Sequence, residues 1–284
     1  MPLSIFYDQI RFEEKELFKT AENLSIPFKR LNVDEFSFTL SRREPELQDV
    51  ETALLRCVSY FKSLHLSSYL EGVGIRSVSS FKTLQIAGNK LFASVELMKN
   101  GVKTPLTVVS FSYPSALDSF NKTGYPAVLK PVIGSWGRLI SLIKDKYTAE
   151  AVLEDRLYMF PLYQVFYVQE YVEKPSRDIR ATVIGDEVVS AIYRVSPPDQ
   201  WKTNIAIGGK SEKAEITGEL AEIVLKAAKA VGGEIVGVDA MESPREGYVV
   251  HEVNHTPEFR GSMEATGVNI PEKILKYLVS KAKR

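Results

Sequence analysis

The stretch "VVHEVNHTPEF", residues 249–259, decides between two folds, because it contains His-Glu-x-x-His, the signature of zinc proteases. That site needs a helix, which places both histidines on one face within reach of a single zinc ion. Here the three valines favour a strand, and Pro257 would end any helix. Residues four apart in a strand are separated by roughly 13 Å, too far for one zinc ion. The stretch therefore predicts a strand and argues against a protease.

In a strand, alternate side chains share a face, so Glu252 and Asn254 are expected to point the same way. His251, Val253 and His255 are expected on the opposite face. A carboxylate beside an amide oxygen suits a hard cation such as Mg²⁺.

A second apolar run, "GGEIVGVDAMES" (232–243), precedes this strand and is separated from it by a Gly-Tyr turn. Two adjacent strands would bring Asp239 towards Glu252 and Asn254, which predicts a metal site made of oxygen ligands. The alternative is that Asp239 caps a turn and Glu252 is a solvated strand residue.

Composition limits the class of protein. The 284 residues suffice for one large domain or two to three small ones, and 44% apolar with 25% charged residues is typical of a globular protein. A net charge of zero gives no reason to expect nucleic-acid binding. No apolar run approaches about 20 residues, the charged start does not resemble a signal peptide, and the single Cys57 fits a reducing compartment. We expect a cytoplasmic protein without membrane contacts.

The first ~85 residues alternate between short apolar runs and a segment of helical periodicity, which predicts a small parallel sheet. "LSIFY" (3–7) and "TALLRCVS" (52–59) are expected strands, with a helix over about 12–21. No Gly-x-Gly-x-x-Gly follows the first strand, which argues against dinucleotide binding.

The rest of the chain changes character. Residues 86–120 are expected to be mostly helical, and two β-rich runs flank a glycine-rich turn at 134–137. Strands are expected between 166 and 195, an amphipathic helix over 217–231 and a last helix beginning near Pro271. The fold class expected is α/β followed by α+β.

Lys130 ends an apolar strand and precedes the turn "GSWGR" (134–138). Such an arrangement can place an ammonium and several backbone N–H groups around phosphates. It is not a Walker A loop, because the lysine precedes the glycines. The alternative is a plain hairpin with an exposed lysine.

The stretch "VQEYVEKP" (168–175) is a strand that ends in carboxylates. Its backbone is suited to pair with an adenine edge, and Glu173 is suited to accept hydrogen bonds from ribose hydroxyls. The alternative is a plain strand that ends at Pro175.

Arginines follow in the next strands. Asp178 and Arg180 are expected on one strand face. Arg194 and Asn204 precede a glycine pair, and such side chains can bind carboxylate or phosphate oxygens. Each of them has the alternative of a solvated surface group.

The order of these features resembles the ATP-grasp superfamily, over nearly the whole chain. Within it, four stretches resemble the RimK-like ligases, and most closely those that join α-aminoadipate or glutamate to the amino-group carrier protein LysW. These stretches are "YDQIRFEEKELF" (7–18), "LKPVIGSWGRL" (129–139), "QEYVEKPSRDIR" (169–180) and "EVNHTPEF" (252–259). The resemblance implies an N-terminal α/β (pre-ATP-grasp) domain over 1–86, a central ATP-grasp subdomain with the glycine-rich loop over 87–168, and a C-terminal subdomain with the metal site over 169–284.

The resemblance also implies residue roles. Lys90 and Lys130 would contact the nucleotide and its phosphates. The other positions implied to bind ATP are Gly134, Ser135, Trp136, Gly137, Arg138, Gln169, Glu170, Tyr171, Val172, Glu173 and Asp178. The implied ligands of Mg²⁺, with two ions expected, are Asp239, Glu252 and Asn254. The implied catalytic residues facing the substrates are Arg180, Arg194 and Asn204. His255 is expected near the site without a chemical role.

The implied reaction phosphorylates a carboxylate with ATP to give an acyl phosphate, which an amine then attacks. Metal ions, lysines and arginines supply the positioning and charge neutralisation that phosphoryl transfer needs. The carboxylate would be the side chain of the C-terminal glutamate of LysW, an acidic carrier, and the amine that of α-aminoadipate, in lysine biosynthesis.

Alternatives remain for the substrate and for the class of protein. "NIAIGG" (204–209) resembles the glutamate-type enzymes of arginine biosynthesis, so glutamate or dual use is the second hypothesis. A non-catalytic nucleotide-binding module is the alternative of another class. The resemblance further implies a homo-oligomer.

Overall fold

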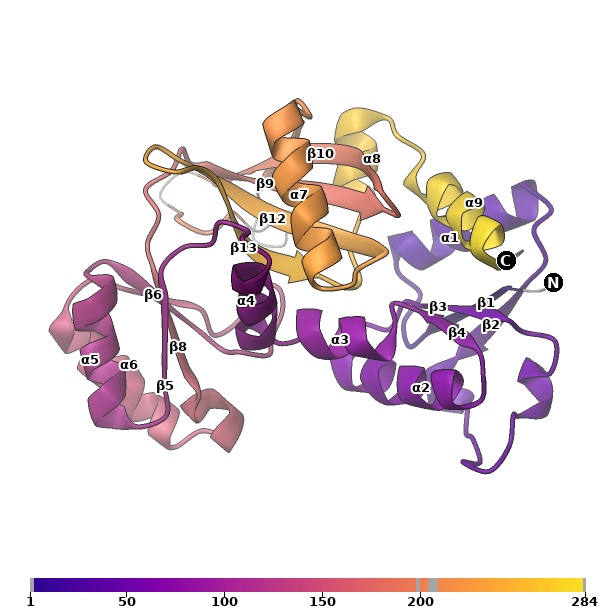
Figure 1. Ribbon diagram of the computed structural model, residues 1–284, viewed down its shortest axis with the longest axis horizontal. Helices are drawn as coiled ribbons and strands as arrows, with labels where there is room; N and C mark the ends of the chain where they lie inside the picture. Colours follow the sequence, from indigo (N-terminus) through magenta and orange to yellow (C-terminus); the bar gives the residue numbers. More distant parts are fainter. Residues whose placement is uncertain (1–2, 198–199, 204–208, 283–284) are drawn as a thin grey trace.

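Three β-sheets, formed by successive parts of the chain, organise the fold (Figure 1). The computed structural model describes residues 3–197, 200–203 and 209–282. None of the helices in these ranges is long and apolar enough to cross a membrane.

The first sheet is parallel throughout, with the strand order β2-β1-β3-β4, which confirms the predicted N-terminal sheet. Its strands alternate with helices because apolar runs of strand length are separated by segments with an apolar helical face. The elements are β1 (Leu3–Tyr7), α1 (Phe12–Asn23), β2 (Phe28–Asn32), β3 (Thr52–Leu55), α2 (Tyr60–Gly72) and β4 (Arg76–Val78), with short 3-10 helices at Val33–Glu35 and Pro45–Leu47.

Two helices, α3 (Phe81–Ala87) and α4 (Lys90–Lys99), lead to the second sheet, an antiparallel sheet of order β5-β8-β6-β7. Its elements are β5 (Thr107–Ser110), α5 (Tyr113–Thr123), β6 (Ala127–Lys130), β7 (Ser141–Ile143), α6 (Lys146–Leu157), a 3-10 helix (Pro161–Gln164) and β8 (Phe166–Glu170). The prediction that residues 86–120 are mostly helical was wrong for β5. Its four residues are too few for a periodic signal, and pairing with β8 decides their conformation.

The third sheet is antiparallel, with the order β11-β10-β9-β12-β13. Its elements are β9 (Arg177–Ile184), β10 (Glu187–Val195), β11 (Lys210–Lys213), α7 (Gly218–Ala230), β12 (Ile235–Ser243) and β13 (Gly247–Asn254). Helices α7 and α4 cover one face and bury its apolar side chains, so the polar side chains of the sheet point to the opposite face. Because β13 is a strand, the prediction of a strand in place of a zinc-protease helix is confirmed.

A β-bulge interrupts the pairing of β12 with β13. Asp239 lies opposite Glu252, but Ala240 lies opposite Val250, so His251 is an extra residue. The bulge turns His251 to the same side as Glu252, where both line a cavity. The prediction that these two side chains lie on opposite faces was therefore wrong, because simple alternation assumes an unbroken register.

The chain returns to the first sheet at its end. Helices α8 (Arg260–Thr266) and α9 (Ile270–Ala282) follow the third sheet, and α9 lies beside α1 (Figure 1). One hydrophobic cluster joins the two ends of the chain, and its members include Leu3, Ile5, Leu17, Phe18, Ile274, Leu275 and Leu278.

Gly88, between α3 and α4, is a site where a methyl group is expected to destabilise the fold. A Cβ there would lie 1.9 Å from Cε2 of Tyr60 and 2.6 Å from the carbonyl oxygen of Leu84. Gly88→Ala is expected to lower the free energy of unfolding by about 1–3 kcal/mol, measured by urea titration. The matched control is Gly72→Ala, because a Cβ at position 72 would meet no atom within 4 Å. This variant should raise the free energy of unfolding by at most about 1 kcal/mol. Equal losses in both variants would contradict the steric argument.

Candidate active site

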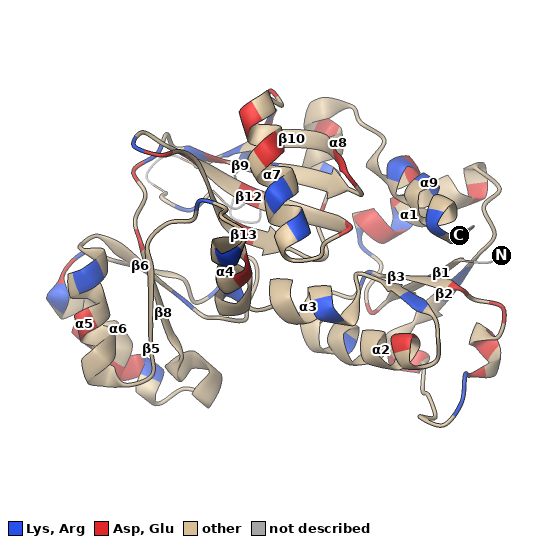
Figure 2. Ribbon diagram, viewed as in Figure 1, with Lys and Arg blue, Asp and Glu red and all other residues tan. Residues whose placement is uncertain are grey.

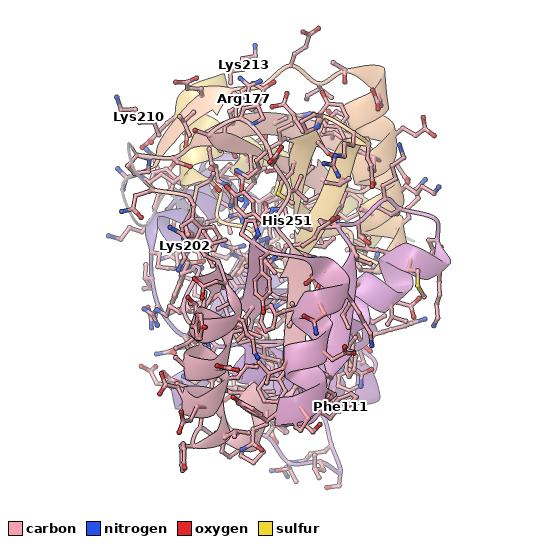
Figure 3. All side chains as sticks on the ribbon, turned by 90° about the vertical axis from the view of Figure 1, so that its left-hand side faces the viewer. Phe111, Arg177, Lys202, Lys210, Lys213 and His251 are labelled. Atoms are coloured by element: carbon pink, nitrogen blue, oxygen red, sulfur yellow. The ribbon has the colours of Figure 1, made fainter. Side chains whose placement is uncertain are left out.

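A cavity of about 1160 Å³ lies where the three sheets meet. The starts of α1 and α2 contribute residues such as Arg11 and Tyr60, and the second sheet contributes Lys130 and Gln169. The polar face of the third sheet contributes Asp178, Arg180, Arg194, Asp239 and Glu252. Viewed from the side, His251 lies in the middle of the molecule, between the part that carries Phe111 and the sheet edge that carries Lys210 (Figure 3).

Two arginines and two aspartates form a buried ionic network on β9, β10 and β12. Arg180 lies opposite Asp239 and donates to both carboxylate oxygens, through Nε and Nη2, at 2.7 Å each. Arg194 lies opposite Asp178 and holds it in the same bidentate way, also at 2.7 Å. Nη2 of Arg194 is also 3.1 Å from Oδ2 of Asp239, which connects the two pairs.

The network keeps both aspartates ionised. Burial alone would raise the pKa of Asp178, but Arg194 outweighs burial, and the pKa is lowered. Burial likewise opposes the charge of Asp239, yet Arg180 and Arg194 together hold its pKa well below the ordinary range. Removing either arginine would leave a buried carboxylate without its partner.

Glu252 and Asn254 lie beside this network. Lys90, at the start of α4, lies with its Nζ 3.2 Å from Oε1 of Glu252 and lowers the pKa of that carboxyl against the effect of burial. Nδ2 of Asn254 donates to Oδ2 of Asp239 at 3.3 Å. A carboxylate only accepts hydrogen bonds, so Asn254 must present its NH₂ group there, and its carbonyl oxygen is left for another partner. The predicted approach of Asp239 to Glu252 and Asn254 is confirmed.

Lys130, His251 and His255 are further buried titratable groups of the cavity lining, so His255 lies near the site as predicted. Burial lowers the pKa of Lys130 to about 8, although Glu252 acts in the opposite direction. Burial, with the positive charge of Lys130 adding to it, lowers the pKa of His251 to about 4, so the imidazole is neutral at pH 7. Nε2 of His251 is buried without a hydrogen-bond partner among the described residues.

The glycine-rich loop after β6 covers one side of the cavity. All five positions from 134 to 138 line it. Gly137 has φ +68°, a conformation that favours glycine. Nε1 of Trp136 donates to Oε1 of Glu258 at 3.2 Å, and Lys202 donates to the carbonyl of Gly137 at 3.0 Å. The loop is thus held by side chains from the C-terminal part of the chain.

The end of β8 lines the cavity together with the glycine-rich loop. Gln169, Glu170, Tyr171 and Val172 line the cavity, whereas Glu173 is exposed and lies outside its lining. Oε1 of Glu170 accepts from the backbone N–H of Leu106 at 2.7 Å, so this side chain is already engaged.

The structure places almost all predicted site residues around one cavity. Besides Glu173, the exception is Asn204, which lies outside the described residues. Sequence reasoning missed several charged residues of the lining, namely Arg11, Lys174, Lys202 and Glu258. Arg11 and Glu258 lie within the two stretches 7–18 and 252–259 quoted above, so a signal for them was present. Nη1 of Arg11 donates to Oε1 of Glu258 at 3.0 Å, which joins the two stretches.

The site offers charge neutralisation and no activated nucleophile among its described residues. Burial raises the pKa of the Cys57 thiol to about 12, which makes it a poor nucleophile. In the view of Figure 2, Lys and Arg occur among Asp and Glu along the chain, for example on α7. Among the charged residues of the lining, the group around Asp239 and Glu252 has four buried or half-buried cations and three carboxylates, a balance that suits a polyanion with a divalent cation. These groups are Lys90, Lys130, Arg180 and Arg194, and Asp178, Asp239 and Glu252.

Comparison with known proteins gives the family. The model of the RimK-like ATP-grasp domain matches residues 87–278, and that of the LysX preATP-grasp domain matches residues 3–86. The chain is 34% identical to the glutamate–LysW ligase ArgX of Sulfurisphaera tokodaii, over 98% of both chains. It is 35% identical to the α-aminoadipate–LysW ligase LysX of the same organism, again over 98% of both.

A solved structure with the same fold is the RimK domain protein ATP-grasp from Sphaerobacter thermophilus. The TM-score is 0.82 at 19% identity, covering 98% of this chain and 100% of the other. The predicted fold class and the prediction of an enzyme are thereby confirmed, and the non-catalytic module is not supported. The cavity combines a glycine-rich loop, buried cations and oxygen-bearing side chains. The chain belongs to the RimK-like ATP-grasp family and is an ATP-dependent ligase.

Proposed function

We propose that this ligase joins the α-amino group of α-aminoadipate to the side-chain carboxylate of the C-terminal glutamate of the carrier protein LysW, as in lysine biosynthesis. The observation that supports this most is the similarity, over 98% of both chains, to ligases named for LysW. Glutamate is the second candidate for the amino acid, because the relatives of the two kinds are equally similar, at 34% and 35% identity.

The side chains of the cavity fit ATP. Two lysines lie next to the glycine-rich loop: Lys90 donates to the carbonyl of Gly134 at 2.9 Å, and Lys130 ends the strand before the loop. In the proposed site these ammonium groups contact the phosphates, and Arg138 lies on the loop above them. The strand end at 169–172 contacts the adenine and ribose. ATP supplies the phosphoryl group that activates the carboxylate.

The donor set also fits Mg²⁺, which prefers oxygen ligands. In the described part of the chain, no three His, Cys, Asp or Glu side chains are grouped to hold a metal. The set is instead two carboxylates and an amide, from Asp239, Glu252 and Asn254. Glu252 is the principal ligand in this proposal, because both oxygens of Asp239 already accept from arginines. Two ions remain part of the proposal.

Arg180 and Arg194 differ in whether a substrate can reach them. Side-chain exposure of 16% for Arg180 and 4% for Arg194 gives only Arg180 a surface that a substrate can reach. We therefore assign substrate contact to Arg180, while Arg194 holds Asp178 and Asp239 in place. Asn204 keeps its proposed role at the substrate.

The test is phosphate release by the purified protein with ATP, Mg²⁺ and LysW, comparing α-aminoadipate with glutamate. Release that requires both the carrier and α-aminoadipate is the expected result. A preference for glutamate would assign the enzyme to arginine biosynthesis and make residues 204–209 a candidate specificity segment. Release that does not depend on LysW would overturn the proposed carrier. Light scattering on the same preparation tests the proposed homo-oligomer.

A further inference from the structure

Lys130 is held at one end of a chain of buried hydrogen bonds. Its Nζ donates to Oε1 of Gln169 at 2.6 Å. Nε2 of Gln169 donates to the hydroxyl of Thr107 at 3.0 Å and to that of Tyr167 at 3.2 Å. The Tyr167 hydroxyl lies 2.8 Å from that of Ser94. With 2% of its surface exposed, Gln169 offers its side-chain polar atoms to protein partners rather than to a ligand.

One backbone carbonyl fixes the direction of the hydrogen bond between Thr107 and Gln169, and with it the orientation of the Gln169 amide. The hydroxyl of Thr107 donates its only hydrogen to the carbonyl of Pro105 at 2.9 Å, so towards Gln169 it can only accept. Gln169 must therefore present its NH₂ group to Thr107 and Tyr167 and its oxygen to Lys130. Tyr167 accepts from Gln169, and either hydroxyl can donate in its contact with Ser94.

A neutral acceptor at this place has a specific value. Lys130 faces charged groups from four other elements, namely Lys90 on α4, Asp178 on β9, Asp239 on β12 and Glu252 on β13. The buried, neutral His251 lies on β13 as well. A carboxylate at position 169 would add a fourth negative charge and compensate the charge of the ammonium in an ion pair. An amide oxygen orients the ammonium and leaves its charge available to a ligand.

We propose that Gln169 is a positioning residue for Lys130, and that the Pro105–Thr107 hydrogen bond fixes the polarity of its amide so that the ammonium points to the phosphates of ATP. This inference rests on the proposed nucleotide contact of Lys130. It replaces the contact of the Gln169 side chain with adenine or ribose.

The experiment measures the affinity of a non-hydrolysable ATP analogue with Mg²⁺ by calorimetry, between about pH 7 and 9.5, where Lys130 loses its proton and few other groups titrate. The wild type should bind more weakly as the pH rises through about 8. The pH at which half of this loss of affinity has occurred is the midpoint. Gln169→Met removes the acceptor and should lower the midpoint by roughly one pH unit, whereas Gln169→Glu should raise it by roughly one pH unit.

Thr107→Val tests the polarity argument at a residue outside the cavity lining. Without the Thr107 hydroxyl, the amide is free to turn its NH₂ group towards Lys130, so the midpoint should move down, as in Gln169→Met. Ser110→Ala is the control, because it removes another hydroxyl of β5, one that accepts from Ser119 at 3.2 Å, outside this chain of bonds. It should leave the midpoint unchanged.

The outcomes separate this inference from the proposed function. Lys130→Met should bind the ATP analogue weakly at every pH, and its affinity should no longer fall between about pH 7 and 9.5. If Lys130→Met binds as the wild type does, Lys130 does not contact the nucleotide and the proposed site is wrong. If Lys130→Met behaves as expected but the two Gln169 variants shift in the same direction or not at all, the positioning role is overturned. Thr107→Val serves as the second variant should Gln169→Met fail to fold.

Discussion

Glu252→Ala is expected to lower ATP hydrolysis coupled to ligation by a factor on the order of 100 or more, while the protein stays folded. The variant removes the carboxylate that we propose as the principal ligand of Mg²⁺, and a metal that neutralises phosphate charge is worth several kcal/mol in the transition state. It also frees Lys90 from its ion pair at 3.2 Å, which adds an unbalanced positive charge to the cavity. Phosphate release measures the activity, and circular dichroism measures the fold.

The matched control is Glu242→Ala, on the strand that carries Asp239. Glu242 accepts from Arg177 at 2.8 Å, and it does not line the cavity. This variant should keep the activity of the wild type. Normal turnover in Glu252→Ala would show that the metal does not bind between β12 and β13. Equal losses of activity in both variants would show that removing any carboxylate from this sheet lowers activity.

Arg194→Met is expected to lower the free energy of unfolding by about 3–5 kcal/mol, the range found when one partner of a buried ion pair is removed. The guanidinium is buried and serves two carboxylates, those of Asp178 and Asp239. Methionine fills a similar volume, so the loss reports the unpaired carboxylate of Asp178 and the weaker neutralisation of Asp239, which keeps Arg180, rather than a cavity. Urea titration at pH 7 gives the measurement.

The dependence of this loss on pH has a definite sign. The pKa values of Asp178 and Asp239 are lowered in the folded protein, so their stabilising contribution is fully present above the ordinary value of about 4. That contribution disappears as the pH falls through the lowered folded values. The difference between wild type and Arg194→Met should therefore be largest near neutral pH and should narrow below about pH 4.

Arg177→Met is the control for Arg194→Met. Arg177 also forms an ion pair, with Glu242, but its side chain is 36% exposed. Such a pair should contribute about 1 kcal/mol or less, because water and salt screen it. Equal losses in the two arginine variants would contradict the view that burial makes the Arg194 network important.

Much of the fold could be predicted because the decisive signals are local. Valines and a proline identified β13 as a strand, and two neighbouring apolar runs placed Asp239 near Glu252 and Asn254. The bulge at His251 could not be predicted, because it depends on which residues of β12 lie opposite. β5 was missed for the same reason: its partner strand lies far along the chain.

The partners of the charged residues were also invisible in the sequence. Asp178 was expected at the nucleotide, yet its carboxylate is held by Arg194, because β9 and β10 are hairpin partners with these residues opposite each other. Gln169 was expected at adenine, yet three protein groups occupy its amide. Residue types predicted the chemistry of the site, whereas strand order decided which group meets which.

The helix α9 has a consequence for how the protein is made. The ribosome releases a chain from its N-terminus, and domains commonly fold as they emerge. Here the hydrophobic cluster over Leu17 and Phe18 is completed by Ile274, Leu275 and Leu278, which are synthesised about 250 residues later. The first sheet cannot bury its outer helix face until Leu278 has left the ribosome. A chain that stops before residue 270 would leave that face exposed to chaperones and proteases.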